Sequence, residues 1–239
     1  MSKPRIIVFA SGDKEGGGSQ ATPLGFSGTE YRQENLGGGS GFENLVRATR
    51  TGVLEADIVA VVSNHEHGGV RERAERLGIP FVYFPAPYDA KHYASLLQKT
   101  SIRADYFALS GWLKMVKGLD PQRTFNIHPA LMSQLGGRFG GANMYGHRVH
   151  EAVKTAFDAG EITESGCSMH FVTDEYDRGP VFFEFRVPLK KGMTADEIAQ
   201  AVNVAEHKWQ PKITNMVVHG EIRWDGKDPK TLVVPPEFK

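Results

Sequence analysis

Asn126 and His128 stand two residues apart in the short run Asn126-Ile127-His128-Pro129. In extended backbone, residues two apart project to the same face, so an amide donor would lie beside an imidazole. Such a pair can stabilise the oxyanion of a tetrahedral acyl-transfer intermediate. The run therefore predicts an acyl-transfer site, although a structural turn with a hydrogen-bonded histidine is its more common use when it stands alone.

A second polar segment, 170–180, reads His-Phe-Val-Thr-Asp-Glu-Tyr-Asp-Arg-Gly-Pro. It ends a predicted strand in an acidic turn and places carboxylates near a sheet edge, where one of them could act as a base. Asp and Gly are also ordinary turn residues. By itself, this segment favours a turn.

A glycine-rich loop, Gly37-Gly38-Gly39-Ser40-Gly41, directly precedes a predicted helix. Glycines let backbone amides approach an anion, and the N-terminus of a helix adds a favourable dipole. The loop is therefore a candidate phosphate-binding site. A flexible linker explains the same residues about equally well.

The remaining reactive side chains do not suggest metal chemistry. The nine histidines include no HExxH pattern, and His147 and His150 have no evident third ligand. The single cysteine, Cys167, has no partner for an internal disulfide or for a cysteine metal site. We predict no bound metal, and a reducing compartment is consistent with this composition.

The elements that must position these segments alternate between short apolar runs and amphipathic stretches. This βαβ repetition predicts an α/β fold: a Rossmann-like, mostly parallel central sheet with helices on both faces and an antiparallel C-terminal part. Pro211 predicts a break or kink of the last helix near Gln210. The expected extended segments are 5–12, 58–63, 81–84, 106–110, 125–129, 168–173 and 181–187, and the expected helices are 42–50, 69–77, 90–99, 149–159 and 194–218.

The length of 239 residues fits a single domain with surface additions. Two glycine-rich stretches, 13–36 and 136–146, interrupt the alternation, and we interpret them as inserted loops. An expression linker is the alternative interpretation of residues 13–36, because Gly-Gly-Gly-Ser occurs once within that stretch and again directly after it. Residues 225–239 form a polar tail without a recognisable motif.

Charge and hydropathy favour small-molecule partners. Lys+Arg and Asp+Glu both number 28, and no basic stripe with interleaved aromatics suggests nucleic acid. No apolar run approaches the roughly 18 to 20 residues that cross a bilayer, and the first residues show no signal-peptide pattern. We predict a cytoplasmic protein without membrane or nucleic-acid partners; a homodimer is left open.

Taken together, these segments resemble the phosphoribosylglycinamide formyltransferase family in their order and approximate spacing. The resemblance spans residues 5 to about 224 and rests on the glycine loop, Ser63-Asn64, Ser110-Gly111-Trp112-Leu113-Lys114, Asn126-Ile127-His128-Pro129 and the segment 170–180. It implies a single formyltransferase domain that moves the formyl group of 10-formyltetrahydrofolate, as co-substrate, to the amine of glycinamide ribonucleotide in de novo purine biosynthesis.

The resemblance also assigns roles to residues. Asn126 and His128 would polarise the formyl group, and Asp177 would assist proton transfer. The residues matched to the ribonucleotide site are Gly39, Ser40, Gly41 and Glu206. The residues matched to the folate site are Trp112, Leu113, Lys114, Met115, Val116, Thr173 and Asp174.

Three features depart from the family pattern: the insertion at 13–36, a glycine at position 41 where the family usually has asparagine, and the insertion at 136–146. We expect the two inserted loops to act as lids. We also expect the Asp177 carboxylate to favour the imidazolium form of His128, which would make the ring a better oxyanion donor.

Other functions fit the same residues less well. Formyltetrahydrofolate deformylase shares the formyl-binding groups but gives the formyl group to water, and it usually carries an additional domain ahead of the first strand. Formyltransferases that act on an amino sugar or on methionyl-tRNA match the motifs less closely. A nucleotide- or phosphate-binding module without catalysis is the alternative from another class. A hydride-transfer enzyme would need a GxGxxG turn after the first strand, which is missing.

Overall fold

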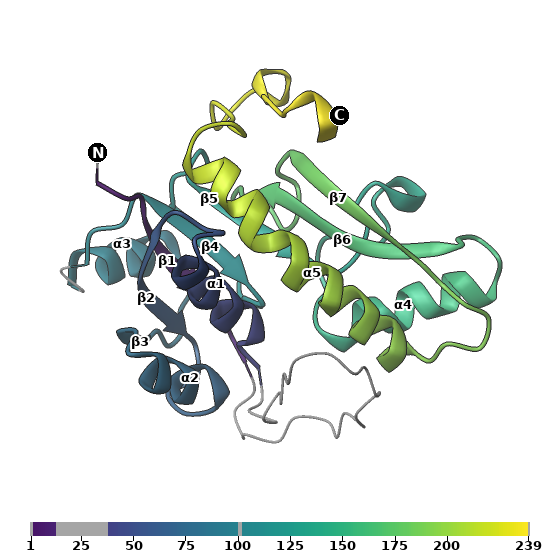
Figure 1. The fold of residues 1–239 in the computed structure, drawn as a ribbon, viewed down its shortest axis with the longest axis horizontal. Helices are drawn as coiled ribbons and strands as arrows, with labels where there is room; N and C mark the ends of the chain where they lie inside the picture. The colour runs from purple at the N-terminus through teal and green to yellow at the C-terminus, as the bar shows by residue number, and fades with distance from the viewer. Residues whose placement is uncertain (1, 13–37, 100–101, 239) are drawn as a thin grey trace.

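The computed structural model describes residues 2–12, 38–99 and 102–238. The expected insertion at 13–36 lies outside the described residues. Within these ranges, seven strands form one mixed sheet in the order β3-β2-β1-β4-β5-β6-β7 (Figure 1). The strands are β1 (Arg5–Phe9), β2 (Asp57–Ser63), β3 (Phe81–Tyr83), β4 (Tyr106–Ser110), β5 (Thr124–His128), β6 (Glu164–Phe171) and β7 (Val181–Pro188).

The sheet is parallel from β3 to β5 and antiparallel from β5 to β7. Strand β1 pairs in parallel with β2 and β4, and β4 pairs in parallel with β5. Strands β5 and β6, and then β6 and β7, pair in antiparallel register. This arrangement confirms the predicted mostly parallel sheet with an antiparallel C-terminal part.

Helices cover both faces of the sheet, because successive side chains of a buried strand point to opposite sides. Ile6 and Val8 of β1 belong to the core that includes buried residues of α1, α2 and α5. Ile7 and Phe9 belong to a second core, which includes Tyr93 of α3. Figure 1 shows α1 and α5 crossing the same face. The helices are α1 (Ser40–Thr51), α2 (Gly69–Leu77), α3 (Ala90–Lys99), α4 (His147–Asp158) and α5 (Ala195–Val218).

Helix α5 runs through Pro211 without ending. Of the predicted break or kink, the break is therefore wrong, and the kink stays a prediction. A proline has no N–H, and its ring disturbs the preceding turn, so the carbonyl of His207 loses its usual donor. Asn44 of α1 supplies a replacement: its Nδ2 donates to the His207 oxygen at 2.7 Å. A capping box between Thr194 and Glu197 fixes the start of the same helix.

Strand β6 begins earlier than predicted, at Glu164, and ends at Phe171. Its first part has small and polar residues and therefore gave no apolar signal. Gly166 is required there, because a Cβ on it would collide with the Phe185 carbonyl oxygen. Thr173 consequently lies in the turn after the strand.

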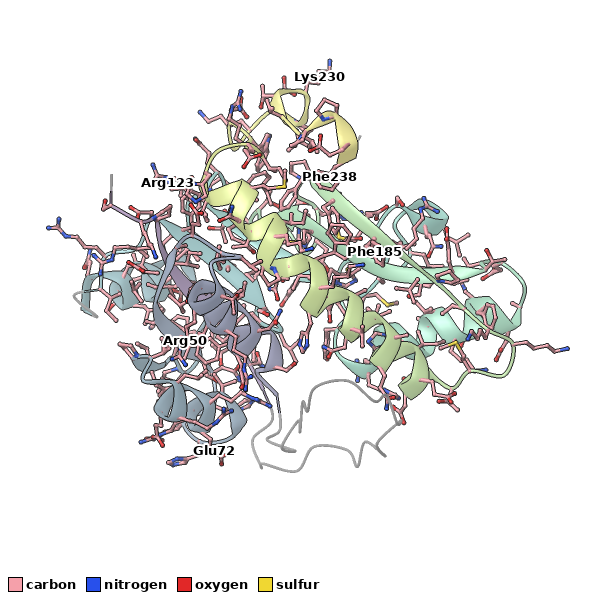
Figure 2. The ribbon with its side chains drawn as sticks, viewed as in Figure 1. Arg50, Glu72, Arg123, Phe185, Lys230 and Phe238 are labelled. Atoms are coloured by element: carbon pink, nitrogen blue, oxygen red, sulfur yellow. The ribbon has the colours of Figure 1, made fainter. Side chains whose placement is uncertain are left out.

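The segment after α5 folds back onto the protein rather than forming a featureless tail. Trp224 is buried and donates through Nε1 to the Asp228 carbonyl at 2.8 Å. Phe238 meets Phe183 of β7 edge to face, with ring centroids 5.5 Å apart. Figure 2 labels Phe238 where the C-terminal segment returns toward the sheet. No helix in the described ranges is both long enough and apolar enough to cross a membrane.

The direction of chain progression reverses between β1 and β4. From β1 the chain moves outward through β2 to β3, and it returns to the other side of β1 as β4. In α/β sheets, ligands bind at the carboxyl ends of strands beside such a reversal. Two hydrogen bonds join the chain there: Ser11 N–H donates to the Gly111 carbonyl, and Leu113 N–H donates to Ser11 Oγ, each at 2.9 Å.

Candidate active site

A cavity of about 890 Å³ opens at this reversal point. Its wall combines the carboxyl ends of β4 and β5, the start of α1, the turn that holds Asp177 and one side of α5. It brings together most of the predicted site residues. Those in its wall are Gly39, Ser40, Gly41, Trp112, Leu113, Lys114, Asn126, His128, Asp177 and Glu206.

Three of the other four predicted folate residues lie around a smaller cavity of about 40 Å³, which shares Trp112 and Asp177 with the large one. Met115, Val116 and Thr173 line it. Asp174 lines neither cavity; it is exposed and accepts the N–H of Gly118 at 3.3 Å. The contact of Asp174 with the folate stays a prediction.

Asn126 and His128 lie on β5 as the spacing predicts. Strand β6 adds a third polar residue, because its antiparallel register sets His170 opposite Asn126. His170 Nε2 lies 3.1 Å from Asn126 Nδ2 and 3.4 Å from Asp177 Oδ1. The predicted pair is thus part of a group of four side chains, Asn126, His128, His170 and Asp177, in which both histidines are buried.

Asp177 is held in an unusual conformation by close contacts. Its φ of 50° lies in the left-handed region, which a non-glycine residue seldom adopts and which is found most often where function constrains the chain. Oδ2 accepts the N–H of Gly141 at 2.9 Å and lies 3.8 Å from His128 Nδ1. Burial opposes the charge, but His170, His128 and the Gly141 N–H outweigh it, so the pKa of Asp177 is lowered.

The surroundings of His128 oppose the charge that we expected on its ring. Burial lowers the pKa of its imidazole, and this effect outweighs the opposing influence of Asp177 and of the Phe139 carbonyl. The ring is 4% exposed and its Nε2 lies 2.6 Å from the Phe139 oxygen. The structure therefore favours the neutral imidazole rather than the predicted imidazolium.

The glycine loop meets the cavity at the start of α1. Gly39 caps the helix with a φ of 84°, and no side chain caps the helix there, so its first N–H groups can face an anion. Ser40 Oγ lies 3.2 Å from His207 Nε2. Arg73 lines the cavity and donates to the Gly38 carbonyl at 3.0 Å, which ties α2 to the loop.

Gly41, the departure from the family pattern, has a local explanation. A Cβ on Gly41 would overlap Ser110 Oγ and would lie 3.2 Å from Gln210 Oε1. Ser110 and Gln210 are buried, and they bond to each other at 3.4 Å. A side chain at position 41 would require them to move.

Helices α4 and α5 supply a further part of the wall. Glu206 is partly buried there, and burial raises its pKa to about 7. His150 of α4 also lines the cavity; it is buried, and its Nδ1 has no hydrogen-bond partner among the described residues. Burial, with His147 and His128 nearby, lowers the pKa of His150 to about 4. Sequence reasoning had weighed His150 only as a metal ligand and therefore missed this position.

The inserted segment 136–146 is also part of the site. It begins at the short 3-10 helix Gln134–Gly136, and its residues 141–146 line the cavity. Phe139 is fully buried, and Arg138 pairs with Glu161 at 2.5 Å. These contacts anchor the first part of the segment, and the expected movement as a lid stays a prediction. Among the residues that the structure describes, no group of three or more His, Cys, Asp or Glu side chains is arranged to hold a metal ion.

Comparison with known proteins points to one family. Residues 35–214 match the model of the family described as formyl transferase. The chain is 32% identical to the chloroplastic phosphoribosylglycinamide formyltransferase of Arabidopsis thaliana over 79% of its own length and 65% of that protein's. It is 28% identical to phosphoribosylglycinamide formyltransferase of Escherichia coli strain K12, over 78% of this chain and 86% of the relative. It thus spans somewhat less than two thirds of the plant relative.

Solved structures show the same fold. Glycinamide ribonucleotide transformylase 1 from Symbiobacterium toebii superposes with a TM-score of 0.70 at 22% identity, over 94% of this chain and 92% of that one. A formyltetrahydrofolate deformylase from Pseudomonas syringae pv. tomato superposes with a TM-score of 0.66 at 18% identity, over 93% of this chain and 64% of that one. With the family model matched over most of its length, this chain belongs to the formyl transferase family.

Proposed function

We propose that this chain transfers the formyl group of 10-formyltetrahydrofolate to the amine of glycinamide ribonucleotide. The observation that carries the proposal is the meeting of Asn126, His128 and Asp177 in a cavity whose far end is the uncapped start of α1. The first three residues suit acyl transfer, and the helix start suits a phosphate. The relatives whose names carry this activity support the same assignment.

The formyl group of the co-substrate is bound to a folate nitrogen. Three side chains, those of Asn126, His128 and Asp177, take part in its transfer. Asn126 donates through its amide to the formyl oxygen as the neutral amine attacks the formyl carbon. His128 adjoins the same oxygen, and Asp177 assists removal of the proton from the attacking nitrogen, directly or through water. The new C–N bond forms, the bond to the folate nitrogen breaks, and that nitrogen takes up the proton. Free tetrahydrofolate leaves.

Hydrolysis of the same formyl group is the second candidate. It would need the formyl-binding residues but no anion site, because water is the acceptor. The glycine loop and Arg73 in the same cavity therefore favour transfer to a phosphorylated acceptor. The cytoplasmic location and the homodimer stay predictions.

Release of tetrahydrofolate from 10-formyltetrahydrofolate, measured with and without glycinamide ribonucleotide, tests the proposal. We expect release to depend on the ribonucleotide and to match the formation of formylated ribonucleotide. Release of formate without the ribonucleotide would instead indicate the hydrolase. The absence of any release would indicate another acceptor or a binding module without catalysis.

A further inference from the structure

We propose that the main chain of residues 139–141 positions the His128 and Asp177 pair, and that it leaves Nδ1 as the one ring nitrogen through which His128 exchanges a proton. This inference deepens the proposed function and rests on it. It assigns a positioning role to part of the 136–146 segment, which was expected to be a lid.

The first contact fixes the tautomer of His128. Its Nε2 lies 2.6 Å from the Phe139 carbonyl oxygen. A carbonyl oxygen can only accept a hydrogen bond, so Nε2 must carry the hydrogen. The neutral ring then has its lone pair on Nδ1, which faces Asp177 Oδ2 at 3.8 Å. Any proton that the ring gains must arrive at Nδ1.

The second contact comes from Gly141, two residues after Phe139, and it holds Asp177. The N–H of Gly141 donates to Oδ2 at 2.9 Å. This is the same oxygen that faces Nδ1 of His128. Gly141 has a φ of 94°, a conformation that glycine adopts readily and other residues do not. One short stretch of main chain therefore orients both members of the pair.

The stretch is anchored to the rest of the protein next to both contacts. The side chain of Phe139 is fully buried in the main core. Arg138 pairs with Glu161 at 2.5 Å, and Gly140 N–H donates to the Gly137 carbonyl at 3.2 Å. Catalytic groups need such support, because a misplacement of about 1 Å can cost a hundredfold in rate.

Other titratable groups surround the pair and must be counted in any pH profile. His170 approaches Asp177 from β6, and its Nε2 lies 3.4 Å from Oδ1. Tyr176 precedes Asp177 in the turn, and His150 of α4 is close enough to His128 for their charges to interact. The proposal concerns only what the 139–141 main chain adds to this environment.

Nitrogen-15 NMR of the unmodified protein tests the first contact without any substitution. We expect His128 to show the Nε2–H tautomer at a pH above its pKa, because the Phe139 carbonyl oxygen accepts a hydrogen bond from that N–H. A dominant Nδ1–H tautomer, or an even mixture of tautomers, would overturn the proposal. This measurement needs no substrate, so it is independent of whether the proposed transfer reaction is observed.

The second contact is tested by Gly141→Ala, with Gly136→Ala as the matched control. Both glycines have positive φ, 94° and 68°, both belong to the 136–146 segment, and an added Cβ would meet nothing within 4 Å at either. Backbone strain should therefore lower the melting temperature of both variants similarly. Only Gly141→Ala should displace the N–H that favours the charged form of Asp177.

We expect Gly141→Ala to lower kcat on the order of 10- to 100-fold. We also expect it to move the acid limb of the kcat/KM profile to higher pH, because Asp177 would then be protonated more easily. Gly136→Ala should keep the profile of the unmodified protein. An unchanged acid limb in Gly141→Ala, or equal changes in both variants, would overturn the positioning role. If the unmodified protein transfers no formyl group, the proposed function fails, and carbon-13 NMR of Asp177 in both variants tests the contact alone.

Discussion

Glu206 lines the cavity, and its buried carboxyl group makes the stability of the protein depend on pH. Burial raises its pKa to about 7, from a usual value of 4.5. The only hydrogen bond to its carboxyl group among the described contacts comes from Asn203, at a long 3.5 Å. The folded protein therefore favours the protonated carboxyl group more than the unfolded chain does. Stability from this group is present below pH 4.5 and is lost as the pH rises through 7.

We predict that Glu206→Gln gains stability over the unmodified protein as the pH rises from about 5 to about 8, because glutamine cannot ionise. The difference in melting temperature between the two proteins measures this effect. Glu72→Gln, a change at an exposed carboxyl group on α2, is the control and should show no such trend. A difference for Glu206→Gln that is independent of pH would contradict the assignment. Affinity for glycinamide ribonucleotide should fall in the same variant if Glu206 contacts it.

At the residue scale, the sequence predicted the side chains that we propose act on the formyl group. Asn126, His128 and Asp177 line one cavity. Residue types and spacing suggested the first two, and the family resemblance added Asp177. The contacts from Phe139 and Gly141 could not be predicted, because they come from main-chain atoms that every residue has. Burial opposes the predicted charge on His128, and the sequence, which shows the carboxylate of Asp177, does not show the degree of burial.

Helices α1 and α2 are joined by a buried carboxylate, Glu43, which is 9% exposed at its side chain. It pairs with Arg47 at 2.6 Å and with Arg76 at 2.9 Å, and it also pairs with Arg73. Burial opposes its charge, but the hydrogen bonds from Arg76, Arg47 and Arg73 outweigh this and lower its pKa to about 2. The stability that this carboxylate provides is present above pH 4.5 and is lost as the pH falls toward 2.

We predict that Glu43→Gln lowers the free energy of unfolding at pH 7 by about 3 kcal/mol, because it removes the carboxylate that balances buried positive charge. Urea unfolding measures the change. The control is Glu75→Gln, which removes an exposed i,i+4 pair with Arg71 and should cost no more than about 0.5 kcal/mol. Equal losses in the two variants would show that Glu43 has no special role between the helices.

The bond from Asn44 to the His207 carbonyl exists because Pro211 cannot donate to it. We predict that Asn44→Ala costs about 1 kcal/mol, the usual loss for a buried acceptor left without its donor. In the Pro211→Ala background the cost should be smaller, because an alanine at that position restores an N–H to the helix. A double-mutant cycle by urea unfolding measures this coupling. Additive losses would mean that Asn44 does not compensate for the proline.

At the element scale, the order of strands and helices was predictable, because apolar runs and amphipathic stretches alternate clearly. Two elements show the limits of that reasoning. The early start of β6 was missed, because its first residues are small and polar. Of the break or kink predicted in α5, the break was wrong; the donor that replaces the lost hydrogen bond comes from Asn44, which is distant in sequence.

The whole molecule builds the site from both halves of the sheet. The parallel half provides the glycine loop and the Ser110 to Lys114 segment, and the antiparallel half provides His170 and Asp177. Strand β5 carries Asn126 and His128 at the boundary between the two halves. The cavity at the reversal point could be expected from the fold class, whereas its α4 wall with His150 depends on packing between distant helices.

The central claim is that Asn126, His128 and Asp177 act together on one formyl group. The most direct measurement is ribonucleotide-dependent release of tetrahydrofolate by His128→Ala and Asp177→Asn, together with ribonucleotide binding by calorimetry. We predict that turnover falls on the order of a hundred- to thousandfold in His128→Ala, with a clear loss also in Asp177→Asn, while both variants still bind the ribonucleotide. Wild-type turnover in either variant would contradict the claim.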